Sequence, residues 1–294
     1  MVPYTADEIR SRLGISTSVV SDRPLDATIL EQIREAGIPN LELQEHPINP
    51  YRDDEPETMN EIVSACRALD LSIVSFHARF YEVRGHLDWS DRNNLGWAGE
   101  SQRRREVDRC KLIIDHLLSL GCTEWVTHLP ITDDSTRTSY VELARHYEGQ
   151  DFRLLIENNM TQQQNVAACI EWVDDIGHPK IGVCLDIGHE VNEQRQNLMI
   201  QAGTPTRVIG NLGHRLRHLH LHEWVGSAVG PKTPHGSDHY APFDEGGQMP
   251  WDEIFTALHD IGYPGAFMFE PLHEARYSKD PIEKTGCFPD RLCA

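Results

Sequence analysis

Residues 153–189 read RLLIENNMTQQQNVAACIEWVDDIGHPKIGVCLDIGH, and their pattern indicates the fold class. Arg153–Glu157 and Gly182–Asp186 are short apolar runs, and each ends in a carboxylate. Asn165–Ile176, between them, has the apolar spacing of an amphipathic helix. A strand, a helix and a second strand in this order predict parallel strands joined by a right-handed crossover.

The same alternation runs through the whole chain. Candidate strands are Gly14–Val20, Asn40–Gln44, Ser72–His77, Glu124–His128, Arg153–Glu157, Gly182–Asp186, Arg217–His222 and Ala266–Glu270. Candidate helices between them include Ala27–Ala36, Glu57–Leu69, Glu106–Leu120, Asn165–Ile176 and Trp251–Ile261. Eight such units predict an α/β fold, a single-domain (β/α)₈ TIM barrel over residues 1–294.

The competing architecture is an open doubly wound sheet. That fold usually has a glycine-rich turn after its first strand, whereas residues 18–26 here read SVVSDRPLD. Two long connections, at about 81–101 and 223–250, follow the third and seventh strands. Both leave the carboxyl ends of strands, so we expect them over the active-site face of a barrel.

Composition limits the partners. The chain has 27 Lys+Arg against 46 Asp+Glu, a net charge of −19, which disfavours nucleic acid and anionic membranes. Seven cysteines without a Cys-x-x-Cys pair fit a reducing compartment. The segment MVPYTADEIRSRLG lacks the apolar core of a signal peptide, and no apolar run approaches the roughly 20 residues of a membrane span. We expect a cytoplasmic protein, and homo-oligomerisation stays open.

Six consecutive strands end in a carboxylate or an imidazole. These residues are His77, His128, Glu157, Asp186, His220 and Glu270. Strand ends of a parallel barrel converge on one face, where unpaired buried carboxylates would repel one another. A divalent cation removes that cost. We therefore predict one divalent metal ion held by Glu157, Asp186, His220 and Glu270.

The other histidines leave alternatives open. His77 and His128 could be metal ligands, hydrogen-bonded histidines at the barrel mouth or substrate contacts. In the run His218, His220 and His222, a period of two places all three on one face. His220 matches the other strand ends in register, so His218 should lie deeper and His222 at the mouth, near substrate.

Several motifs resemble one known family. They are Ile156-Glu157-Asn158, Leu185-Asp186-Ile187-Gly188-His189, His218-Leu219-His220-Leu221-His222, GGQMPW at 246–251, Gly262-Tyr263-Pro264-Gly265 and Phe269-Glu270-Pro271. The chain resembles the xylose-isomerase-like barrel superfamily, which includes sugar and sugar-phosphate isomerases and epimerases, inosose dehydratases and endonuclease IV-type DNA repair enzymes.

Similarity to the ketose 3-epimerases of this superfamily implies a function. It implies that the four ligands hold Mn²⁺, with Zn²⁺, Co²⁺ or Mg²⁺ also suited to such a donor set. It implies that Glu157 and Glu270 exchange a proton with opposite faces of a substrate carbon, and that His189 contacts substrate. The expected reaction is isomerisation or epimerisation of a sugar or sugar-like polyol through an enediolate. Those epimerases carry an Arg shortly after the strand-seven histidine, whereas residues 222–227 read HEWVGS.

Three alternatives remain. One is a metal-dependent lyase or dehydratase acting on a keto-sugar or keto-inositol, and another is a sugar-binding barrel without catalysis. The third is a zinc phosphodiesterase like endonuclease IV, whose three zinc ions have ligand positions matched by His77, His128, Glu157, Asp186, His189, His220 and Glu270. The third ion also needs an Asp-x-His, whereas Ser237-Asp238-His239 has a spacing one residue different. The acidic charge also opposes DNA binding.

Trp89 and Trp97 lie in the long connection after the third strand. We expect this segment to border the substrate pocket, with at least one indole ring offering an apolar face to a sugar. The other interpretation is a loop packed on its own aromatic residues.

Overall fold

The computed structural model describes most of the chain. The described residues are 2–20, 23–44, 56–78, 99–128, 134–161, 163–226, 238–272 and 278–294. Trp89 and Trp97 lie outside them, as does most of the connection at 81–101. Among the helices in these ranges, none is both long and apolar enough to cross a membrane.

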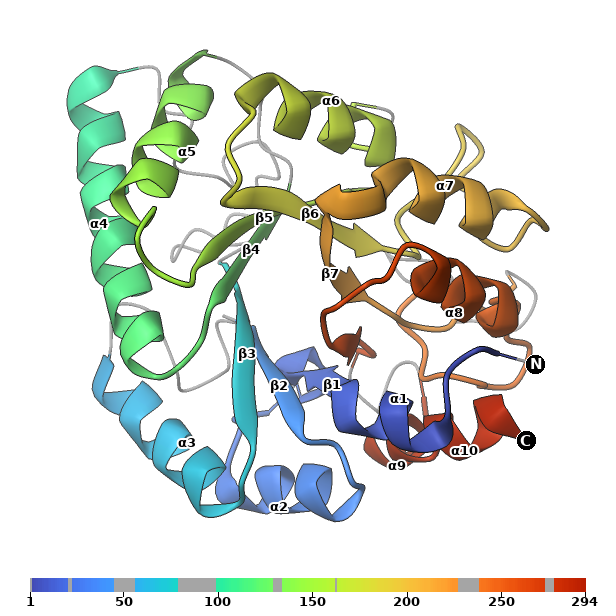
Figure 1. The fold of residues 1–294 in the computed structure, drawn as a ribbon. Coiled ribbons are helices and arrows are strands. Elements are labelled where there is room, and N and C mark those ends of the chain that lie inside the picture. The colour runs from blue at the N-terminus through green and yellow to red at the C-terminus, as the bar shows by residue number, and fades with distance from the viewer. Residues whose placement is uncertain are drawn as a thin grey trace.

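Eight parallel strands form one sheet, in the order β7-β6-β5-β4-β3-β2-β1-β8 (Figure 1). The strands are β1 (Leu13–Ser16), β2 (Asn40–Gln44), β3 (Ser72–His77), β4 (Glu124–His128), β5 (Arg153–Glu157), β6 (Ile181–Asp186), β7 (Leu216–His220) and β8 (Phe267–Phe269). A parallel bridge between Leu221 and Phe269 joins the two edges. The Leu221 N–H donates to the Met268 carbonyl, and the Glu270 N–H donates to the Leu221 carbonyl, both at 2.8 Å. The predicted (β/α)₈ barrel is confirmed.

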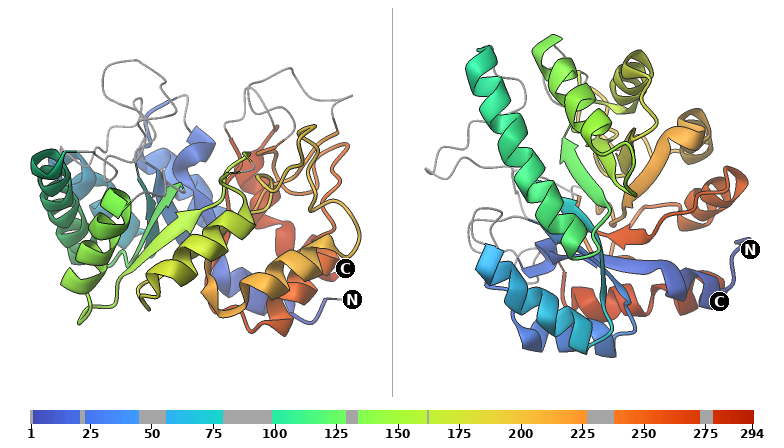
Figure 2. Two further views of the ribbon diagram at one scale, coloured as in Figure 1. Left: turned by 90° about the horizontal axis from the view of Figure 1, so that it is seen from above. Right: turned by 60° about the vertical axis from the view of Figure 1, so that its left-hand side comes forward.

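Helices surround this sheet (Figures 1 and 2). They are α1 (Ala6–Arg12), α2 (Ala27–Glu35), α3 (Pro56–Ala68), α4 (Glu100–Ser119), α5 (Asp134–His146), α6 (Val166–Ile176), α7 (Thr204–Leu212), α8 (Trp251–Asp260), α9 (Pro281–Gly286) and α10 (Phe288–Cys293). In α6, Val166, Cys169, Trp172 and Val173 are buried, because a spacing of three to four residues places them on one face. Asn165 caps this helix by accepting the Ala168 N–H.

The first strand was predicted too long. It ends at Ser16, and Thr17–Val20 form a 3-10 turn instead of the end of a strand. The hydroxyl side chains explain the difference, because they take hydrogen bonds that a ladder would otherwise provide. Thr17 Oγ1 accepts the Gln44 N–H at 2.8 Å, and Ser18 Oγ donates to the Pro271 carbonyl at 3.2 Å. The seventh strand ends at His220, two residues earlier than predicted, and the eighth ends at Phe269, one residue earlier.

The barrel interior is partly polar. Val126, Leu155 and Cys184 form a small apolar cluster separate from the large core between sheet and helices. Side chains alternate along a strand, so the residues two positions later point into the same interior. Those residues are His128, Glu157 and Asp186, at the carboxyl ends of β4, β5 and β6. The polar site therefore lies at the end of the barrel that the sequence predicts.

Candidate metal centre

Glu157 joins three imidazoles from different strands. Its Oε2 lies 2.9 Å from Nε2 of His77 and 3.0 Å from Nε2 of His128. Its Oε1 lies 2.8 Å from Nδ1 of His220. The Glu157 residue is only 1% exposed, so these contacts occur in a solvent-excluded interior. The structure thus brings together four of the side chains that the strand ends predicted.

Glu270 contacts the same imidazole as Glu157, and Asp186 lies at the end of the neighbouring strand β6. Glu270 Oε2 lies 3.2 Å from the same nitrogen, Nδ1 of His220. Asp186 Oδ1 accepts the N–H groups of Gly188 at 2.7 Å and His189 at 3.0 Å. Within the described ranges, the buried Asp186 Oδ2 has no hydrogen-bond partner. A buried carboxylate oxygen in this condition is costly unless a cation binds it.

The electrostatics of the two glutamates differ. Burial raises the pKa of Glu270 well above its usual value, although the charge of His220 opposes the shift, and nearby Glu157 and Asp186 reinforce it. For Glu157, burial is outweighed by the charges of His128 and His220, which hold its pKa well below the usual value. A divalent cation among these groups would relieve the repulsion that Glu270 meets. Three carboxylates and one imidazole therefore fit Mn²⁺, Mg²⁺, Zn²⁺ or Co²⁺.

Backbone carbonyls fix the orientation of three histidines. The Nδ1–H of His77 donates to the Ala78 carbonyl at 3.0 Å, and that of His189 donates to the Asn158 carbonyl at 3.1 Å. The Nδ1–H of His239 donates to the Glu270 carbonyl at 2.9 Å. An imidazole whose Nδ1 carries this hydrogen presents its Nε2 to the site, which is how metal-binding histidines are commonly held.

A second candidate ligand set lies beside the first. Asp238 Oδ2 is 3.8 Å from Nε2 of His189 and 3.6 Å from Nε2 of His239. These three residues are buried, and their ligand atoms lie within 4.8 Å of one another. Neither Asp238 oxygen has a hydrogen-bond partner in the described part of the chain, and burial raises the pKa of this carboxyl well above its usual value. The different Asp-His spacing in the sequence therefore does not keep the two residues from meeting His189.

Glu223 holds the segment that follows Asp238 and His239. Its buried carboxylate accepts the backbone N–H groups of Phe243 at 3.2 Å, Gln248 at 2.9 Å and Met249 at 2.7 Å. The indole N–H of Trp251 donates to it as well, at 2.9 Å. This one side chain fastens residues 243–251 to the end of β7, and sequence reasoning did not single it out.

His222 supports Asp186. Its Nδ1 accepts the His239 N–H at 2.8 Å, so its Nε2 carries the proton and donates to Asp186 Oδ1 at 2.9 Å. The predicted substrate contacts of His77, His128, His189 and His222 stay predictions, as do the metal ligands and the acid–base pair. Sequence reasoning also missed Glu42, whose carboxylate meets Nε2 of His220. Metal-binding histidines usually donate their second ring N–H to a carboxylate or carbonyl, so the need for such a partner of His220 is the signal that points to Glu42.

Comparisons with known proteins agree with the fold. Residues 30–285 match the family model of the xylose isomerase-like TIM barrel, and the chain belongs to this family. A D-psicose 3-epimerase of Enterocloster bolteae is 33% identical over 103 residues, which are 35% of this chain. The chain spans 27% of the length of that curated relative.

Solved structures are similar over nearly the whole chain. A xylose isomerase-like TIM barrel protein of Mycobacterium smegmatis in complex with magnesium has a TM-score of 0.66 at 13% identity, covering 99% of this chain and 97% of that one. The 3-keto-D-glucoside 4-epimerase YcjR of E. coli, in its apo form, has a TM-score of 0.65 at 14% identity, covering 96% and 99%. The predicted superfamily is confirmed, and the proteins similar to this chain include sugar epimerases.

Proposed function

We propose that the protein is a divalent-metal-dependent isomerase or epimerase acting on a sugar or sugar-like polyol. One observation carries the proposal: Glu157 Oε1 and Glu270 Oε2 lie 2.8 and 3.2 Å from the same atom, Nδ1 of His220. Two carboxylates, one at the end of β5 and one directly after β8, thus approach a single imidazole nitrogen. A substrate bound beside His220 would then have a carboxylate within reach on two sides, as inversion at one carbon requires.

The residues have distinct roles in this proposal. Glu157, Asp186, His220 and Glu270 hold the cation, which supplies Lewis-acid stabilisation of negative charge on a substrate oxygen. Glu157 takes the proton from the carbon next to the substrate carbonyl, and Glu270, when protonated, gives its proton to the opposite face. Proton exchange with solvent then returns both groups to their starting state. His77 and His128 contact the second Glu157 oxygen and keep the carboxylate in one orientation. His189 contacts the substrate hydroxyls.

Solvent proton exchange tests the proposal. The protein is incubated with Mn²⁺ and a panel of keto- and aldo-sugars in D₂O, and products are analysed by NMR. We expect deuterium on the carbon next to the carbonyl. Glu157→Gln and Glu270→Gln should each lose turnover by several orders of magnitude, because the chemical step loses its acid or base. Glu190→Gln, which changes a carboxylate that accepts the Val166 N–H, is the matched control and should retain turnover. Turnover without deuterium incorporation would favour a hydride shift instead.

A metal-dependent phosphodiesterase is the second candidate. The observation that favours it is the set of His189, Asp238 and His239, which adds a further place for a cation beside Glu157 and its imidazoles. Metal analysis separates the two functions, because the isomerase needs about one equivalent and an endonuclease IV-like site about three of Zn²⁺. Hydrolysis of bis(p-nitrophenyl) phosphate that disappears in His239→Ala would support the phosphodiesterase. Proton exchange on a sugar that persists in His239→Ala would exclude it.

A further inference from the structure

A row of side chains lies directly beneath the candidate metal centre. Glu124, His218, Glu42 and His220 follow one another through the barrel interior, and we call them the Glu42 row. Glu124 Oε2 is 2.9 Å from Nδ1 of His218, and Nε2 of His218 is 3.1 Å from Glu42 Oε2. Glu42 Oε1 is 3.0 Å from Nε2 of His220. The row connects the start of β4 with the candidate ligand on β7.

His220 has two ring nitrogens with different surroundings. Nδ1 faces Glu157 and Glu270, whereas Nε2 faces Glu42. An imidazole binds a cation only through a nitrogen that carries no proton, so the other nitrogen must carry it and needs an acceptor. His220 and Glu42 are both 0% exposed, so bulk solvent cannot be that acceptor. Glu42 is the acceptor that the fold supplies.

Glu42 is itself held by polar neighbours. Ser75 Oγ donates to its Oε2 at 2.9 Å, and His218 approaches the same oxygen. These contacts fix the position of the carboxylate, and a fixed acceptor in turn fixes the plane of the His220 ring.

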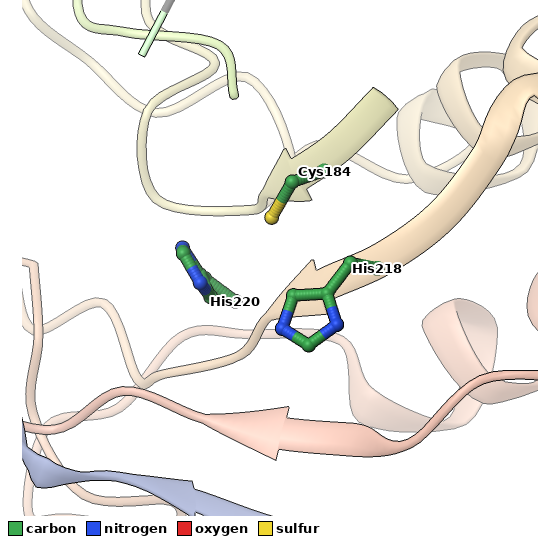
Figure 3. Close-up of side chains that lie close together, drawn as sticks. All are labelled: Cys184, His218 and His220. Carbon is green, nitrogen blue, oxygen red and sulfur yellow. The ribbon is translucent and has the colours of Figure 1, made fainter. Parts of the chain in front are cut away.

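A competing arrangement uses the same histidines. The ligand atoms of Cys184, His218 and His220 lie within 4.8 Å of one another, and Figure 3 shows the side chain of Cys184 close to those of His218 and His220. A soft cation could bind there. However, Nδ1 of His218 faces Glu124 and Nε2 faces Glu42, and each of these contacts is to a single carboxylate. At His220, by contrast, two carboxylates meet at the one nitrogen Nδ1, which is where a cation would reduce repulsion.

We propose that Glu42 is a positioning residue, which accepts the Nε2–H of His220 and so leaves Nδ1 aimed at the cation. This inference rests on the proposed metal centre. It adds a residue on β2 that touches neither substrate nor cation but sets the affinity of the site through His220. Partners of this kind typically contribute 10- to 100-fold to metal affinity.

Cation affinity in Glu42 variants tests the inference. Mn²⁺ affinity is measured by competition with a chelating dye in Glu42→Leu, which removes the acceptor, and in Glu42→Gln, which keeps an acceptor oxygen. We expect Glu42→Leu to bind about 10- to 100-fold more weakly and Glu42→Gln to recover part of that loss. Thr127→Val removes a different buried hydrogen bond, to Tyr140 Oη, and should leave affinity unchanged. Cys184→Ala should also leave it unchanged.

A second readout does not depend on activity or folding energy. In Mg²⁺-loaded protein labelled with ¹⁵N-histidine, His220 should show a protonated Nε2 and an unprotonated Nδ1. Wild-type protein that binds no Mn²⁺ overturns the metal centre itself. If the wild type binds Mn²⁺ and Glu42→Leu binds it with equal affinity, this inference alone is overturned. The same holds if Cys184→Ala loses as much Mn²⁺ affinity as Glu42→Leu. If Glu42→Leu does not fold, the Mn²⁺ affinity of Glu42→Gln and the NMR spectrum decide: wild-type affinity in Glu42→Gln together with a protonated Nδ1 of His220 refutes the role of Glu42.

Discussion

Asp186→Asn separates cation binding from folding. In the wild type, Asp186 Oδ1 accepts hydrogen bonds from the Gly188 and His189 N–H groups and from His222 Nε2. Asparagine keeps an oxygen for these donors and places a neutral amide nitrogen where the unpartnered Oδ2 lies. The substitution weakens these hydrogen bonds but also removes a buried charge, and the two effects on stability oppose each other. We therefore expect the free energy of unfolding of the cation-free variant to lie within about 1 kcal/mol of that of the wild type.

Cation binding should raise the thermal stability of the wild type. At a Mn²⁺ concentration 100-fold above the dissociation constant, binding stabilises the folded protein by about 2.7 kcal/mol. An unfolding entropy of about 2.1 cal/mol/K per residue gives about 0.6 kcal/mol/K for 294 residues, so Tm should rise by about 4 °C. If Asp186→Asn weakens binding 100-fold, the stabilisation drops to about 0.4 kcal/mol, which is less than about 1 °C.

Thermal unfolding during a Mn²⁺ titration measures both quantities. The control is Glu190→Gln, which removes another carboxylate from the segment after β6 and should keep the full rise in Tm. A rise of equal size in Asp186→Asn and wild type would refute the assignment of Asp186 as a ligand. A large loss of stability without Mn²⁺ would show that its three hydrogen bonds dominate instead.

Two further predictions concern the neighbours of the site. Burial opposes the charge of His218, but its hydrogen bonds with Glu124 and Glu42 raise its pKa to about 9 from 6.5. The stability that it contributes is therefore present below pH 6.5 and is lost as pH rises through about 9. In urea unfolding of chelator-treated protein, the free energy of unfolding should fall by up to about 3 kcal/mol as pH rises through about 9, and should depend less on pH in His218→Gln. The same pH dependence in both proteins would contradict the raised pKa of His218. A Cβ at Gly188 would lie 1.9 Å from His222 Cε1, so Gly188→Ala should displace that ring from Asp186 and weaken Mn²⁺ binding about tenfold, as dye competition would measure. Unchanged affinity would mean that His222 does not support Asp186.

Much of the fold is predictable because each strand is marked by a short apolar run of neighbouring residues. The bounds of β2, β3, β4 and β5 match the predicted ones, since each is a short apolar run that ends at a polar residue. Helix α5 was missed because its buried face includes Thr136 and Ser139, whose hydroxyls hide the helical apolar spacing. Helix α7 was missed because Pro205 and Gly210 look like breakers, although Pro205 lies in the first turn, where proline is tolerated.

The site was only partly predictable. Strand-end residues such as Glu157 and Asp186 follow from the barrel, because parallel strands end on one face. The role of Glu42 does not follow from the sequence, because its partners His218 and His220 are 176 and 178 residues away. In addition, a charged residue between two leucines has the pattern of an exposed strand position. The place of Asp238 depends on contacts with residues far along the chain, such as that of the neighbouring His239 with the Glu270 carbonyl, and sequence spacing does not report these contacts.

Anomalous diffraction from crystals soaked in Mn²⁺ locates the cation and identifies its ligands. We predict a peak within about 2.0–2.6 Å of carboxylate oxygens of Glu157, Asp186 and Glu270 and of Nδ1 of His220. A strong peak bound by His189, Asp238 and His239 with none at the four predicted ligands would contradict this prediction, as would a Mn²⁺ ion held by Cys184 and His218.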